Sequence, residues 1–171
     1  MRWIYSILLV LAGGFTAVMM YPSIGDRVPT EDPDIDPSVP SPRLSPEQVV
    51  ACQVTAMHQS IADESLLVPC YSLASPSNRA MTGPLHHFWA MCHSPPYDLL
   101  CESDSWQIGK AQIEDSRASV IVSVLTHDGP RGFEFQLSRQ QSQPVKDCWM
   151  TDSVAVLPIL DVTHRPSAEG S

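Results

Sequence analysis

The fold of this chain is decided by residues 74–93, ASPSNRAMTGPLHHFWAMCH, taken together with residues 148–154, CWMTDSV. In the first stretch, Thr82-Gly83-Pro84 favours a helix start. The apolar residues that follow recur at helical spacing, at Leu85, Phe88, Trp89 and Cys92. The second stretch indicates a strand with a large aromatic residue and an aspartate. Helices followed by strands predict an α+β fold.

On the N-terminal side of this stretch, a further helix is expected from residue 45. Ser45-Pro46-Glu47-Gln48 offers a serine N-cap, proline at the first helical position and glutamine for a capping box. A shorter helical piece is expected over residues 66–73, and Ser75-Pro76 starts another turn. The chain thus begins its folded part with about three helices.

Beyond Pro95-Pro96 the apolar residues alternate, as in strands. The clearest case is residues 117–126, RASVIVSVLT, followed by a turn at residues 127–130. Strands are also expected over residues 97–102, 106–114, 132–137 and 145–157. The expected architecture is about three helices packed on one face of a curved antiparallel sheet of four to five strands.

Composition narrows the class of partner. The 171 residues suffice for one domain with appendages, and the net charge is −9. Residues 45–157 hold twelve acidic against six basic residues. Because such a surface repels phosphate backbones, nucleic acid is not expected as a partner. A phosphate loop is not found in the sequence either, and no cofactor is expected.

The first 21 residues predict a membrane segment. Residues 3–21 carry no charged side chain and follow Arg2, and a helix of this length just crosses a bilayer core. The favoured interpretation is an uncleaved single-pass anchor with the domain on the exported side. A cleaved signal peptide is the alternative, and it would leave a secreted or periplasmic protein.

A linker and a tail are expected on either side of the domain. Residues 22–44 are rich in proline and acid and contain few large apolar residues, so they are expected to form a semi-stiff spacer. The domain is placed at residues 45–157, and residues 158–171 are expected to be a flexible tail.

Several motifs resemble an uncharacterised family of bacteria, notably cyanobacteria, and plant plastids, a "domain of unknown function". They are SPEQVV (45–50), residues 74–91, YDLL (97–100), FEFQLSRQ and CWMTDSV. The resemblance covers about residues 45–157. It implies a cystatin-like cone of the nuclear-transport-factor-2-like superfamily, and an exported domain in a periplasm or thylakoid lumen. It carries no known catalytic residues, and members of the superfamily include isomerases as well as binding proteins.

Asp152 is the first candidate for chemistry. A regular strand would place Cys148, Met150, Asp152 and Val154 on one face, so that the carboxyl group would project into the cone. It could serve there as a general base, with Tyr71 or Tyr97 as hydrogen-bond donor, as in the isomerase branch. The competing interpretation is a structural aspartate paired with an arginine.

Other residues could line a ligand cavity or bind metal. Trp89, Trp149 and Met150 could line the cavity, although aromatic residues at such periods more often form the core. His86 and His93 share one helix face beside Cys92. Two histidines without a HExxH or CxxC motif are too few ligands, so no metal site is expected.

Five cysteines in an exported domain raise the question of disulfides. Cys70 and Cys101 fall near element ends and are the favoured pair. Cys52 and Cys92 are expected in the core, and Cys148 is ambiguous.

The sequence as a whole suggests a membrane-tethered, exported domain that binds a partner protein or a small apolar ligand, with a homodimer through the outer sheet face as an expectation of the superfamily. The alternative is an isomerase- or dehydratase-type enzyme using Asp152.

Overall fold

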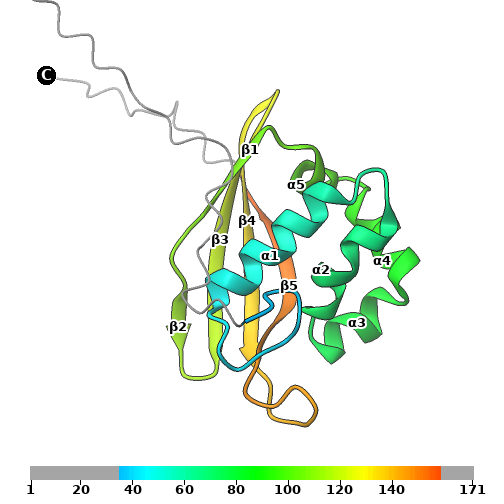
Figure 1. Cartoon of the computed structure of the whole chain (residues 1–171). Helices are drawn as coiled ribbons and strands as arrows, with labels where there is room; N and C mark the ends of the chain where they lie inside the picture. The colour runs from blue at the N-terminus through cyan, green and yellow to red at the C-terminus, as the bar shows by residue number, and fades with distance from the viewer. Residues whose placement is uncertain (1–34, 159–171) are drawn as a thin grey trace, which may run out of the picture.

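The capping signal at Ser45 produces the first helix, α1 (Pro46–Gln59). In the computed structural model, which describes residues 35–158, the Ser45 amide donates to Gln48 Oε1 at 2.8 Å. The Gln48 amide in turn donates to Ser45 Oγ at 3.3 Å, which completes a capping box. The helix lies across one face of the sheet (Figure 1).

Shorter helices follow and gather beyond α1 (Figure 1). Within residues 35–158 they are η1 (Glu64–Leu67, a 3-10 turn), α2 (Val68–Ser72), α3 (Pro76–Thr82), α4 (Leu85–Cys92) and α5 (Asp98–Glu102). The described part therefore has five α-helices rather than about three. Ser75 caps α3 by accepting from the Asn78 amide at 3.2 Å.

The prediction of a strand over residues 97–102 is wrong, because residues 98–102 form α5. Leu100 and Cys101 are both fully buried and point into the helical layer. A short apolar run is compatible with either a strand or a buried helix, and periodicity alone cannot separate the two.

The strands form one antiparallel sheet, so the expected α+β class and the strand number are confirmed. They are β1 (Ser105–Ile108), β2 (Gln112–Glu114), β3 (Arg117–Thr126), β4 (Gly129–Arg139) and β5 (Trp149–Leu157). The order is β1-β3-β4-β5, and β2 pairs with β3 on the same edge as β1.

The single strand expected over residues 106–114 is split at Gly109. The Gly109 amide donates to Ile121 O at 2.8 Å, and a Cβ at Gly109 would lie 3.0 Å from that oxygen. The backbone of the edge thus approaches β3 more closely here than a side chain would allow comfortably.

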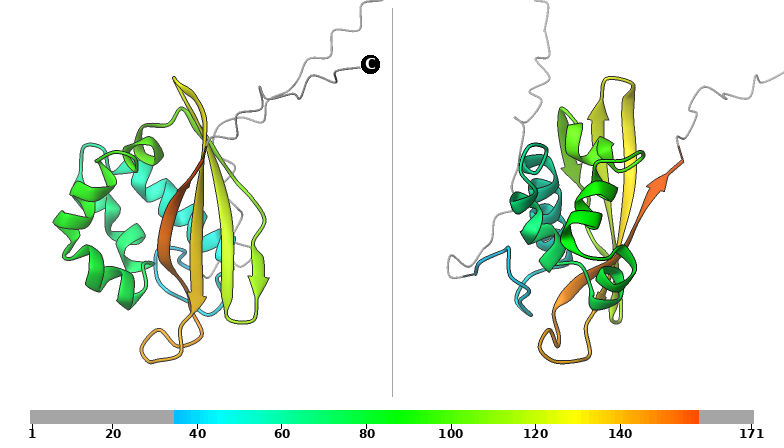
Figure 2. Two further views of the ribbon diagram at one scale, coloured as in Figure 1. Left: turned by 180° about the vertical axis from the view of Figure 1, so that it is seen from behind. Right: turned by 90° about the vertical axis from the view of Figure 1, so that its right-hand side faces the viewer.

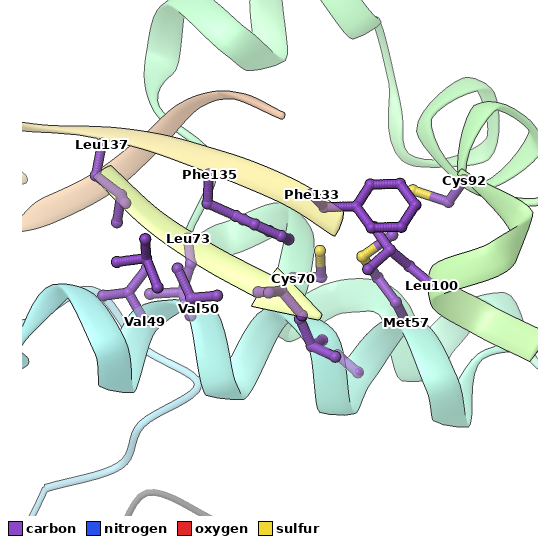
Figure 3. Packing of buried hydrophobic residues seen from close by; sticks show 14 of the residues in the cluster. Val49, Val50, Met57, Cys70, Leu73, Cys92, Leu100, Phe133, Phe135 and Leu137 are labelled. Atoms are coloured by element: carbon purple, nitrogen blue, oxygen red, sulfur yellow. The ribbon is translucent and has the colours of Figure 1, made fainter. Parts of the chain in front are cut away.

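The core lies between the helices and one face of the sheet. Alternate residues of β3 and β4 are buried on this face, and they include Val120, Val122, Phe133 and Phe135. Figure 3 shows Phe135 and Leu137 of β4 above Val49 and Val50 of α1, with Met57, Cys92 and Leu100 grouped near Phe133. The alternation of apolar and polar residues that predicted these strands therefore also predicts which face of the sheet the helices cover.

The domain starts before residue 45. Leu44 is 2% exposed and belongs to the core cluster, and Ile35 packs against that cluster. The described part of the expected spacer, residues 35–44, is thus part of the domain.

The expected anchor (1–21), the earlier linker residues 22–34 and the tail from residue 159 lie outside the described residues. Among residues 35–158, no helix has the length and apolar character that a membrane crossing requires.

Candidate functional site

A β-bulge fixes the position of Asp152. Leu137 pairs with Thr151 and Gln136 pairs with Ser153, so Asp152 is an extra residue on β5 with no partner on β4. The bulge breaks the regular alternation expected for residues 148–156. Trp149 and Val154 both contact the core although they are five positions apart, and Asp152 lies on the opposite face of the sheet.

This opposite face is not crossed by the helices that cover the core. Seen from behind, β3 and β4 lie in front with α1 beyond them (Figure 2). We call it the open face. Its side chains are the positions of β3 and β4 that alternate with the buried ones, such as Ser119, Ile121, Glu134 and Gln136.

One end of the open face is hollowed into a groove of about 580 Å³. The groove runs from β2 across β3 and β4 to β5, and α3 contributes Ser77 at its margin. The residues that line it are Ser77, Gln112, Glu114, Arg117, Ala118, Ser119, Glu134, Gln136, Leu137, Ser138 and Asp152.

The groove is polar and negatively charged. Three carboxylates, from Glu114, Glu134 and Asp152, face one guanidinium, from Arg117. Ser119 Oγ donates to Glu134 Oε1 at 2.6 Å, which holds this carboxylate in place. Between the next two strands, Ser153 Oγ of β5 donates to Gln136 Oε1 of β4 at 3.2 Å. The surface therefore presents amide, hydroxyl and carboxylate groups in fixed positions.

The other end of the open face carries an apolar patch made of Ile121, Leu125 and Leu157. Ile121 is 43% exposed and Leu125 is 50% exposed. Leu157 pairs with Gly132, and its Cδ1 lies 3.1 Å from the place where a Cβ of Gly132 would stand. The absence of a side chain at Gly132 thus allows Leu157 to lie over β4.

The two tyrosines proposed as partners of Asp152 lie elsewhere. Tyr71 packs against the core and donates its hydroxyl to Gly83 O at 3.0 Å. Tyr97 also packs against the core and donates to Val154 O at 3.2 Å. Both hydroxyls are thus used by backbone carbonyl groups, and neither tyrosine lines the groove that contains Asp152.

The residues expected to line a cavity are packing residues. Trp89 donates from Nε1 to Ser60 O at 3.1 Å, and its ring lies 4.5 Å from that of His93. Trp149 is 4% exposed with the guanidinium of Arg139 5.0 Å from its ring centre, and Met150 is fully buried. These contacts favour the core interpretation of the tryptophans over the cavity interpretation.

All five cysteines are free thiols in the structure, so the expected Cys70–Cys101 disulfide is not formed there. Both residues lie in the core, and Cys101 Sγ instead donates to Cys92 O at 3.5 Å. Burial raises the pKa of Cys92 and of Cys101 to about 12 and that of Cys70 well above its ordinary value. Such thiols behave as small apolar side chains rather than as nucleophiles.

His86 and His93, the two histidines considered as ligands, each contact a neighbour on α4. His86 is exposed and lies beside His87, with 4.2 Å between the ring centres and 55° between the ring planes, whereas His93 Nδ1 lies 2.8 Å from Trp89 O. Among residues 35–158, no three His, Cys, Asp or Glu side chains are arranged to hold a metal ion.

The sequence indicates Asp152 as a site residue but not the residues that surround it in the groove. The alternation that marks Val120 and Val122 as buried also directs Arg117 and Ser119 to the other face, so the contribution of β3 to the groove could be predicted from it. The bulge at Asp152 carries no comparable signal, since it depends on the register of β4 with β5. No family model, curated protein or solved structure matches the chain.

Proposed function

We propose that this is a protein-binding domain that acts on the exported side of a membrane, with its open face as the binding surface. The observation that carries the proposal is the composition of that face. Exposed apolar side chains at Ile121 and Leu125 lie on the same surface as a polar groove of about 580 Å³. Apolar contact area next to polar, hydrogen-bonding groups is the composition of protein interfaces.

A small apolar ligand is a weaker candidate. It would need space between the helices and the sheet, where the side chains of both layers contact each other (Figure 3). The groove on the open face is lined largely by polar groups, which an apolar ligand would desolvate without compensation. A partner protein uses both the apolar patch and the groove.

The isomerase-type alternative receives no support from the site geometry. Asp152 lines the groove, whereas the hydroxyls of Tyr71 and Tyr97 donate to the backbone carbonyls of Gly83 and Val154 and neither tyrosine lines the groove. A general base and its hydrogen-bond donor must reach the same substrate. An assay of Asp152→Asn on enolisable ketones would test this alternative, with turnover lost in the variant as the result in its favour.

We also propose that the domain is a cone of the nuclear-transport-factor-2-like type. Its support is the chain order, in which helices precede an antiparallel sheet and α1 lies across the covered face (Figure 1).

A homodimer through the open face would bring together two grooves that each hold three carboxylates and one guanidinium. Because like charges oppose that contact, a different protein is the better occupant.

The test uses the full-length chain in its native membrane, with a photo-crosslinking amino acid in place of one isoleucine. Ile121 lies on the open face, and Ile61, which is 49% exposed in the turn just after α1, is the matched control. We expect a discrete crosslinked product from position 121 and not from position 61, and we expect Leu125→Lys to remove it. Identical products from both positions, or only a product of twice the chain mass, would contradict the proposal.

A further inference from the structure

The groove differs from the rest of the open face in both charge and hydrogen-bonding groups. We infer that it takes an extended segment of the partner protein that carries lysine or arginine side chains. The inference rests on the proposed function, and it adds the chemistry of the segment that is bound.

The first support is a row of polar side chains that crosses the strands. Gln112 of β2 pairs with Ser119 of β3, Ser119 pairs with Gln136 of β4, and Gln136 pairs with Ser153 of β5. With strands about 4.8 Å apart, this row extends over about 14 Å, the length of about four residues of extended chain. Amide and hydroxyl groups both donate and accept hydrogen bonds, as a peptide backbone requires.

The second support is charge. Glu114, Glu134 and Asp152 come from three different strands, so the negative charge is spread along the groove. Within residues 35–158 no salt bridge neutralises these carboxylates, and Arg117 is the only basic side chain in the lining. The groove thus carries a net charge of −2, which attracts a cationic segment and repels an acidic one.

The third support is what the lining lacks. The apolar residues in the lining are Ala118 and Leu137, whose side chains belong to the core on the covered face, and none of the lining residues is aromatic. Lipid tails need apolar walls, and sugar rings are commonly bound against aromatic faces. A peptide segment is preferred to a small free amine because the apolar patch at Ile121 and Leu125 lies on the same face and can contact the rest of the same partner.

The experiment measures binding of fluorescent peptides to the full-length protein in detergent micelles by anisotropy. One peptide is an extended, proline-free octamer with lysine at every second position, and in its matched counterpart glutamate replaces lysine. Free spermidine is the third probe. We expect the lysine peptide to bind, the glutamate peptide not to bind, and added salt to weaken the lysine peptide.

Two groove variants and a matched control locate the site. Glu134→Gln and Asp152→Asn each remove one negative charge while keeping a similar shape. Glu102→Gln removes one from the exposed end of α5, outside the groove. We expect each groove variant to raise the Kd of the lysine peptide about two- to fivefold and Glu102→Gln to leave it unchanged. Circular dichroism and thermal unfolding confirm that the variants are folded.

Each other outcome overturns the inference. These outcomes are equal binding of both peptides, unchanged binding in the groove variants, spermidine binding without peptide binding, and no binding at all. The proposed function is judged separately by crosslinking at Ile121. If that crosslink persists while the peptide test fails, only the basic-segment inference is lost.

Discussion

Thr151 Oγ1 donates a 2.6 Å hydrogen bond to Gln53 Oε1 and thereby joins β5 to α1 across 98 positions of sequence. Gln53 Nε2 donates to Cys70 O at 3.1 Å, so one buried amide group connects α1, α2 and β5. Gln53 is 2% exposed and Thr151 is 1% exposed. This polar contact sits within an otherwise apolar core and fixes the start of β5 just before the bulge at Asp152.

Thr151→Val should therefore be clearly destabilising although the two side chains have nearly the same shape. The variant leaves Gln53 Oε1 buried without a donor, which costs about 1–3 kcal/mol of unfolding free energy. Urea unfolding measures the difference. Ser153→Ala removes an exposed hydroxyl from the same strand and should cost less than about 0.5 kcal/mol. Equal losses in the two variants would show that burial of the amide is not the cause.

Much of the fold could be predicted from local patterns, and the groove only in part. The capping box at Ser45 and the alternation of β3 predicted an element start and a buried face that the structure confirms. The strand expected at residues 97–102 failed because a run of Leu99, Leu100 and Cys101 fits a buried helix equally well. The position of Asp152 depends on a one-residue shift between β4 and β5, which no local pattern encodes.

The buried thiols predict a loss of stability at high pH. An unfolded cysteine loses its proton near its ordinary pKa of 9.0, whereas burial raises the pKa of Cys92 and of Cys101 to about 12. Above pH 9 the unfolded state therefore binds fewer protons than the folded state. The unfolding free energy should then fall as pH rises from 9 toward 12, by up to about 1.4 kcal/mol per pH unit for each thiol.

The measurement is urea unfolding at several values between pH 8 and pH 10.5, for the wild type and for Cys92→Ala. The variant should be less stable at pH 8 because it creates a cavity, but its stability should fall less steeply above pH 9. Parallel curves would refute a raised pKa at Cys92. Thiol-reactive reagents should also label Cys92 and Cys101 slowly at pH 8 in the folded state and rapidly in urea.

Leu44 predicts that the end of the expected spacer contributes to stability. Its side chain is 2% exposed in the core cluster, so Leu44→Ala should lower the unfolding free energy by about 2–5 kcal/mol. Val39 is 54% exposed in the same segment, and Val39→Ala should change it by less than about 0.5 kcal/mol. Thermal and urea unfolding give both values. If Leu44→Ala left the unfolding free energy unchanged, Leu44 would not be part of the core and the domain would start at residue 45.

Two glycines of the sheet should respond differently to alanine because of what a Cβ would meet. At Gly109 it would lie 3.0 Å from the backbone oxygen of Ile121, which already accepts the Gly109 amide at 2.8 Å. At Gly132 it would meet the side chain of Leu157, with Cδ1 at 3.1 Å, the end of a flexible side chain, and Cβ at 3.3 Å. Backbone cannot move aside as a leucine side chain can, so Gly109→Ala should cost about 1–3 kcal/mol and Gly132→Ala less. Urea unfolding ranks the two variants. If Gly132→Ala were instead the more destabilising variant, β1 and β2 would be able to shift away from β3 at little cost. Gly132→Ala should also move Leu157 in the apolar patch and thereby reduce the crosslink at position 121.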